Sequence, residues 1–89
     1  MTYAVFLHTK AAKELKKLEP KISAGITQAA KELRENPDKI GKPLSHSDFW
    51  SLRAGDYRAI YEVGQREKRV VILFVGHRSK VYDDFTNML

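Results

Sequence analysis

The chain has 89 residues, which is enough for one domain with a small hydrophobic core and too short for two catalytic domains. Hydrophobic residues make up 43% of the sequence and charged residues 30%, a composition typical of a globular protein rather than a disordered or fibrous one. The sequence has no cysteine, which excludes disulfide bonds, thiol nucleophiles and cysteine-ligated metals, and suits a reducing cytoplasm.

The formal net charge of +5 and an isoelectric point near 9.6 favour an acidic partner, and nucleic acid is the commonest such partner. The two halves of the chain differ in the cation they use. Eight of the nine basic residues in positions 1–49 are lysines, whereas five of the seven in positions 50–82 are arginines. Because guanidinium forms a rigid fork that matches phosphate oxygens, the second half is the better candidate for binding a phosphate group.

The N-terminal segment from Tyr3 to His8 is rich in β-branched and aromatic residues, which predicts a strand. Its short apolar core is far below the length of the hydrophobic region of a signal peptide. The longest apolar run, Val70–Val75, is also too short to cross a bilayer as a helix. We therefore expect a soluble cytoplasmic protein.

Two amphipathic helices are predicted after this strand. In the first, Thr9 fits as the N-cap, apolar residues recur at helical spacing, and the helix ends near Glu19–Pro20. Proline is well tolerated in a first helical turn, so the second helix can begin there and stop at Asn36–Pro37. Its apolar stripe consists of Ile22, Ile26, Ala29 and Leu33. The two helices would form an α-hairpin that buries one stripe each.

The second half of the chain is predicted to form three strands, at Phe49–Ala54, Tyr57–Val63 and Arg69–His77. The segment Lys39–Asp48, rich in Gly, Pro and Ser, predicts a loop, and the tail Val81–Leu89 predicts a final helical turn. The order is β-α-α-β-β-β within a single domain that covers residues 1–89. This order predicts an α+β fold in which a mostly antiparallel sheet carries both helices on one face.

A cationic cluster is expected where the first two of these strands meet. With Gly55 and Asp56 as a type II′ turn, Arg53 faces Arg58 across the sheet. Their side chains would be roughly 5 Å apart, and like charges so placed are destabilising, so a bound anion would relieve the repulsion. The alternative is that both arginines extend into solvent or pair with Glu62 and Asp56.

A third arginine, Arg78, follows the last strand by one residue. Alternation along this strand places four residues on one face: Ile72, Phe74, Gly76 and Arg78. The other face then carries Val71, Leu73, Val75 and His77. Gly76 would leave space beside Arg78, or mark a bulge or the strand end. His77 continues an apolar face, which favours a structural histidine over a proton carrier.

Three aromatic residues need separate interpretations. Trp50 and Tyr61 are expected in the core or on the sheet surface. Tyr82 falls past the last strand in a polar tail, where a ring beside arginines could stack an unpaired base; capping the edge of the core is the alternative. The three histidines have no metal-ligand spacing, so metal binding is not expected.

Two segments, FWSLRAGDYRAIY at residues 49–61 and VGHRSKVY at residues 75–82, resemble the signature of the RelE/ParE toxin superfamily. The preceding β-α-α order matches too, so the resemblance extends over almost the whole chain. It implies a toxin of a type II toxin-antitoxin system. RelE-like members are ribosome-dependent endoribonucleases that cut mRNA in the ribosomal A site, and ParE-like members poison DNA gyrase without nuclease chemistry. Both are inhibited by a cognate antitoxin that wraps the toxin, which would here be RelB-like.

The tail tyrosine favours the RelE branch. The resemblance then implies a metal-independent mRNA interferase whose catalytic set is Arg53, Arg58, Arg78 and Tyr82. Because the 2′-hydroxyl of RNA would attack the scissile phosphate, no cofactor is implied. The arginines would clamp the phosphate and the tyrosine would stack or orient the base.

The sequence departs from the bacterial RelE pattern on the strand that holds Ser51 and Arg53. That pattern has two lysines there, one of them proposed as the general base. Arginine does not deprotonate at neutral pH, so the general base is not identified. Ser51, His77 and Lys80 are secondary candidates for contacts with the substrate, and the last two are fallback proton carriers.

Overall fold

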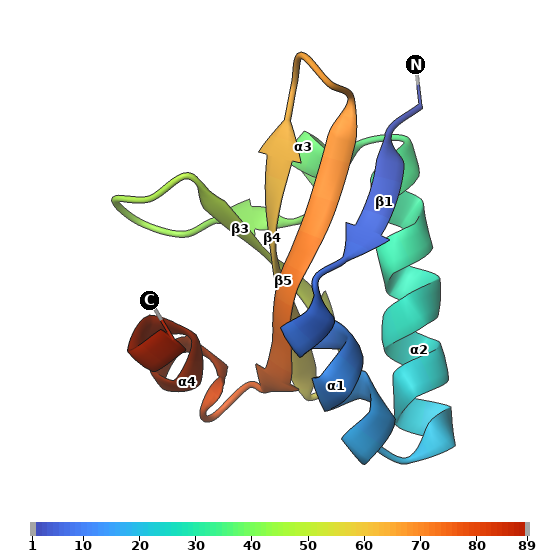
Figure 1. The fold of residues 1–89 in the computed structure, drawn as a ribbon, viewed down its shortest axis with the longest axis vertical. Coiled ribbons are helices and arrows are strands. Elements are labelled where there is room, and N and C mark those ends of the chain that lie inside the picture. Colours follow the sequence, from blue (N-terminus) through green and yellow to red (C-terminus); the bar gives the residue numbers. More distant parts are fainter. Residues whose placement is uncertain (1, 89) are drawn as a thin grey trace.

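A five-stranded sheet forms the frame of the fold (Figure 1). The computed structural model describes residues 2–88, and its strands lie in the order β1-β5-β4-β3-β2. They are β1 (Ala4–Leu7), β2 (Lys42–Pro43), β3 (Phe49–Ala54), β4 (Tyr57–Gly64) and β5 (Arg69–His77). Strand β1 pairs with β5 in parallel and the other pairs are antiparallel, which confirms the predicted α+β fold with a mostly antiparallel sheet.

The helices lie on both sides of this sheet (Figure 1). The helices of the predicted hairpin are α1 (Thr9–Lys17) and α2 (Pro20–Lys31), which is followed by a 3-10 turn (Glu32–Arg34) and the short helix α3 (Pro37–Ile40). On the opposite side of the sheet lies α4 (Val81–Met88). No helix within residues 2–88 has the length and apolar character needed to cross a membrane.

Three predicted helix boundaries are shifted in the structure. Helix α2 ends at Lys31, and the 3-10 turn after it ends at Arg34, before the predicted stop at Asn36–Pro37. His8, rather than Thr9, caps α1, and its Nδ1 accepts the backbone N–H of Lys10 at 3.2 Å. The backbone of His8 is still extended there, because its own N–H donates to the carbonyl of Ile72 at 2.8 Å, where the pairing of β1 with β5 ends. The helix ends at Lys17 because the chain must become extended before Pro20.

The predicted loop and tail also contain more regular structure than expected. Strand β2 lies within the segment predicted as a loop and pairs with β3, which makes a fifth strand. The tail forms α4, a helix of about two turns, rather than one turn. Leu89, the last residue of the predicted tail, lies outside the described residues.

The sheet carries a separate core on each face. The helix-side core lies under α1 and α2 and comprises Tyr3, Ala11, Ile26, Ala30, Leu33, Leu52, Ala59, Tyr61, Val70, Ile72 and Val75. The α4-side core comprises Ile60, Phe74, Val81 and Phe85. Tyr61 is fully buried, its hydroxyl donates to the carbonyl of Pro37 at 2.7 Å, and burial raises its pKa to about 12. The predicted core position of Tyr61 is therefore confirmed.

A β-bulge in β5 changes which residues share a face. Ile60 pairs with Phe74, whereas the next residue of β4, Tyr61, pairs with Ile72, so Leu73 is the extra residue. Ile72 consequently lies in the helix-side core and Phe74 in the α4-side core. The prediction that these two residues share a face is wrong, because the alternation is interrupted at Leu73.

Candidate functional site

The candidate site begins with a row of residues on the sheet face that α4 covers. Arg53 of β3 lies opposite Arg58 of β4, which in turn lies beside Gly76 of β5. A Cβ atom on Gly76 would meet the Cβ of Val81 in α4 at 3.2 Å, so this row faces α4. The predicted opposition of the two arginines is confirmed. It is set by the Gly55-Asp56 turn, in which Gly55 has the positive φ of 62° that its turn position requires.

Arg78 lies beside the same turn. Its backbone N–H donates to the carbonyl of Asp56 at 2.8 Å, and its Nε lies 3.9 Å from the Asp56 carboxylate. The side chains of Arg78 and Asp56 are 59% and 71% exposed, so solvent screens this ion pair and the guanidinium group stays accessible. The backbone contact therefore fixes where Arg78 leaves the sheet, and it brings a third cation to the end of the β3–β4 hairpin.

Neither Arg53 nor Arg58 has a carboxylate partner within residues 2–88, where the only other ion pair joins Lys17 and Glu14. The part of the alternative in which they pair with Glu62 and Asp56 is therefore wrong, whereas the exposed side chain of Arg53 agrees with the part in which it extends into solvent. Arg53 donates from Nε to the carbonyl of Gly55 at 3.4 Å, and Arg58 is half-buried. Two arginines that lie opposite each other without a carboxylate partner make this position a candidate site for an anion.

Tyr82, in the first turn of α4, is held on the same face. Its hydroxyl oxygen lies 3.0 Å from Ser51 Oγ, at hydrogen-bonding distance. Ser51 is two residues from Arg53 along β3, so the two side chains leave the sheet on the same side. The tyrosine is 37% exposed, so its ring keeps an accessible surface while its hydroxyl contacts the sheet.

His77 lies on the opposite face. Its ring packs edge-on against Tyr57, with the ring centroids 5.4 Å apart, and Tyr57 packs against the helix-side core. Its Nδ1 accepts the backbone N–H of Ser79 at 3.2 Å. Lys80 is exposed in the turn before α4, where its N–H donates to the carbonyl of His77 at 3.0 Å. The structure thus brings Ser51, the three arginines and Tyr82 to one region, and it leaves His77 outside it.

Sequence reasoning missed the part that α4 takes in this site. The space left by Gly76 is used by Val81 rather than by Arg78. A signal for the helix was present: Val81, Phe85 and Met88 recur at helical spacing, and two aspartates occupy the first turn. The pairing of Tyr82 with Ser51 had no such signal, because 31 residues separate them.

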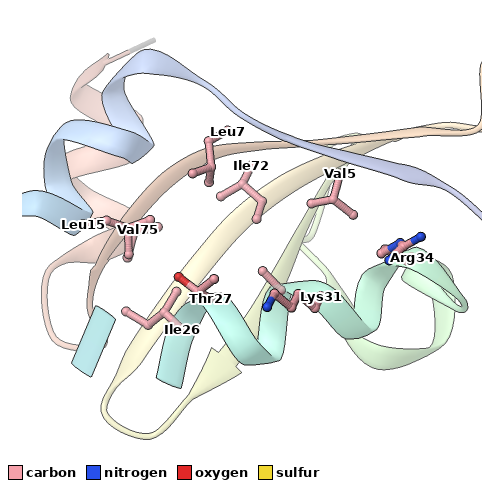
Figure 2. A pocket seen from close by; sticks show the side chains of 10 residues that line it. Val5, Leu7, Leu15, Ile26, Thr27, Lys31, Arg34, Ile72 and Val75 are labelled. Carbon is pink, nitrogen blue, oxygen red and sulfur yellow. The ribbon is translucent and has the colours of Figure 1, made fainter. Parts of the chain in front are cut away.

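A second feature is an apolar cavity of about 300 Å³ between β1, α1 and α2. Figure 2 shows Val5 and Leu7 of β1 lining it from one side, with Lys31 and Arg34 along the helical side. Leu7 and its neighbour Phe6 are each 50% exposed. The cavity therefore combines an apolar lining with two cations, at the edge of the sheet remote from the β2 edge.

The fold and the arginine-bearing face together define a small basic α+β protein that presents cations on one sheet face. Residues 5–82 match the family described as the ParE toxin of type II toxin-antitoxin systems. The toxin RelG of Mycobacterium tuberculosis is 38% identical over 85 residues, which cover 92% of this chain and 98% of RelG.

Solved structures agree with the sequence relatives. The RelBE2 toxin-antitoxin complex of M. tuberculosis contains a chain 36% identical to this one, with a TM-score of 0.82 over 89% of this chain and 94% of that chain. An arginine double mutant of the E. coli toxin RelE in its free state is 26% identical, with a TM-score of 0.78 over 100% and 99% of the two chains. The protein therefore belongs to the RelE/ParE family of type II toxins.

Proposed function

We propose that this toxin is a RelE-type, ribosome-dependent endoribonuclease that cuts mRNA and so inhibits translation. The observation that supports this proposal best is the Arg53–Arg58 pair, which lacks a carboxylate partner within the described residues. Arg78 lies at the end of the same hairpin. Three guanidinium groups around one hairpin end suit the charge and geometry of a phosphodiester.

The proposed reaction needs no resident cofactor, because RNA supplies its own nucleophile. The 2′-oxygen bonds to phosphorus as the bond to the 5′-oxygen breaks; the 2′-hydroxyl loses its proton and the leaving 5′-oxygen gains one. The products are a 2′,3′-cyclic phosphate, or the 3′-phosphate after hydrolysis, and a 5′-hydroxyl. Arg53, Arg58 and Arg78 stabilise the charge that develops on the phosphorane, and Tyr82 orients the base. The ribosome supplies much of the alignment.

The second candidate is inhibition of DNA gyrase without nuclease chemistry. It is favoured by the matched family, whose description names the ParE toxin. This function would use the protein as an interaction surface, and it requires neither in-line alignment of a phosphate nor a base-stacking tyrosine.

Inducing the gene in cells while mapping RNA ends and DNA breaks separates the candidates. The nuclease proposal predicts new 5′-hydroxyl ends within translated mRNA and intact chromosomal DNA. Double-strand breaks with intact mRNA would contradict it and support the gyrase candidate. Expression without growth arrest would contradict both, and would leave a protein that only binds its antitoxin or nucleic acid.

We further propose that a RelB-like antitoxin binds this toxin in the cytoplasm and covers the edge of the sheet at β1. Ala4 donates its N–H to the carbonyl of Lys68, just before β5, and His8 donates to Ile72 of β5. The alternation of a parallel ladder therefore turns the backbone groups of Val5 and Leu7 outward. An extended segment could pair with that open edge and place apolar side chains in the adjacent cavity. Lys31 and Arg34 favour acidic residues in such a segment.

Copurification with the antitoxin encoded beside the toxin gene tests this surface. Leu7→Asp should abolish copurification, because it puts a charge into the cavity. Ile40→Asp is the matched control, since Ile40 is a similarly exposed apolar residue, 37% exposed, that does not line the cavity. Retention of the antitoxin by Leu7→Asp would contradict the proposed docking surface.

A further inference from the structure

Ser51 is a polar side chain in an almost fully buried position. It is 6% exposed, and within the described residues its side chain has one hydrogen-bond partner, the hydroxyl of Tyr82 at 3.0 Å. A group so buried has little surface to offer to an RNA strand. Ser51 can affect the proposed reaction only through Tyr82, the residue that it contacts.

We propose that Ser51 is a positioning residue that fixes the phenol of Tyr82 beside the arginine pair; this inference rests on the proposed nuclease function. It replaces the expectation that Ser51 contacts the substrate itself. It also assigns a role to the serine at this position, where the bacterial RelE pattern has a lysine.

The packing of α4 does not by itself hold the side chain of Tyr82 in one orientation. Val81 contacts Gly76, and Phe85 packs in the α4-side core, so these two residues set the position of the helix. Neither contact restrains the partly exposed ring of Tyr82, which could otherwise adopt other rotamers. The hydrogen bond to Ser51 selects one orientation.

The sheet register places the hydrogen bond between Ser51 and Tyr82 next to the arginines. Ser51 lies opposite Ile60. Arg53 lies opposite Arg58, so the two pairs are two residues apart along both strands. Such neighbours on one sheet face are about 7 Å apart. A phosphate between the arginines would therefore leave room for the sugar and base of the same nucleotide to reach the phenol.

A double-mutant cycle on purified toxin and programmed ribosomes tests the proposal. Ser51→Ala should lower kcat for mRNA cleavage about 3- to 10-fold, the loss expected for one partly buried hydrogen bond. KM should change by less than about twofold, because an orienting contact acts mainly in the transition state. In the Tyr82→Phe background, Ser51→Ala should have no further effect. Ser51→Thr, which keeps the hydroxyl, should recover most of the activity, and Ser45→Ala serves as an exposed control.

In the cleavage assay, two results would overturn the proposal: an unchanged kcat for Ser51→Ala, or an equal loss in the presence and absence of the Tyr82 hydroxyl. The same cycle measured as thermal midpoints of the free toxin keeps this inference separate from the proposed function. A wild-type protein that cuts no mRNA would reject the proposed function. If the changes in thermal midpoint caused by the two single substitutions simply add in the double variant, the Ser51–Tyr82 contact itself is rejected.

Discussion

The two faces of the sheet differ in how much they bury and in what they expose. Within the described residues, the helix-side core contains eleven buried residues, drawn from the residue before β1, the helical segments and strands β3, β4 and β5, whereas the α4-side core contains four. On the helix side, the buried hydroxyl of Tyr61 donates to the carbonyl of Pro37. The α4 side instead opposes two arginines that lack a carboxylate partner within residues 2–88.

We infer from this difference that the helix-side face supplies most of the stability, and we propose that the α4-side face accepts a cost in stability in order to bind an anion. An 89-residue domain has only a few kcal/mol of net stability, so opposed like charges are a cost that the larger core must offset. Functional sites are commonly less stable than their frame, because they hold charges ready for a ligand. Variants that change one face at a time test this division.

Removing one large side chain from each core should give unequal results. Leu33→Ala should destabilise the whole fold by about 2–5 kcal/mol, because it leaves a cavity under the helices. Phe85→Ala should lower the unfolding free energy by less, since the short helix α4 can detach as a local unit while the sheet stays folded. Urea denaturation followed by circular dichroism measures both. Equal losses of unfolding free energy for the two variants would show that α4 does not unfold separately from the rest of the fold.

Stability should fall at high pH because of Tyr61. The pKa of this tyrosine is raised from 10 to about 12 in the folded protein, chiefly by burial. A raised pKa gives stability that is fully present below pH 10 and is lost as the pH rises from 10 towards 12. The expected loss is about 2–3 kcal/mol. Denaturation curves between pH 9 and 12 measure it, and Tyr61→Phe should lack this part of the decline.

Two glycine variants should change stability in opposite directions. In Gly76→Ala the new Cβ would lie 3.2–3.4 Å from three atoms of Val81, so α4 must move and stability should fall by about 1–3 kcal/mol. In Gly25→Ala the new Cβ meets nothing within 4 Å, and loss of a mid-helix glycine should stabilise by about 0.5–1 kcal/mol. Thermal melts compare the two. A stabilised Gly76→Ala would contradict the close packing of α4.

Sequence patterns predicted the sheet better than they predicted the site. The turn residues Gly55 and Asp56 act locally, so they fixed the register of the two arginines correctly. The prediction that Ile72 shares a face with Phe74 was wrong because the bulge at Leu73 depends on how β4 and β5 pair, which alternation along one strand does not report. The contact between Ser51 and Tyr82 requires the docked position of α4, and therefore the tertiary fold.

The smallest effect is expected from relieving the opposed charges. Arg53→Ala should raise stability by about 0.2–1 kcal/mol, because it removes the repulsion with Arg58. The gain should be larger at low salt, where screening is weaker, and mRNA cleavage should fall at the same time. Arg66→Ala, in the exposed turn between β4 and β5, should change neither quantity. Denaturation at two salt concentrations tests this, and a destabilised Arg53→Ala would contradict the repulsion.

The most direct test of the central claim is the cleavage rate of the double variant Arg58→Ala with Arg78→Ala on translating ribosomes. We expect a loss of at least about 100-fold in mRNA cleavage, because two groups that stabilise the phosphorane are removed together. The circular dichroism spectrum should be unchanged. Arg66→Ala with Arg69→Ala removes the same charge from the turn between β4 and β5 and the start of β5, at the other end of these strands, and should cleave at the wild-type rate. Wild-type cleavage by the Arg58 and Arg78 double variant would contradict the assignment of the arginine-bearing face as the active site.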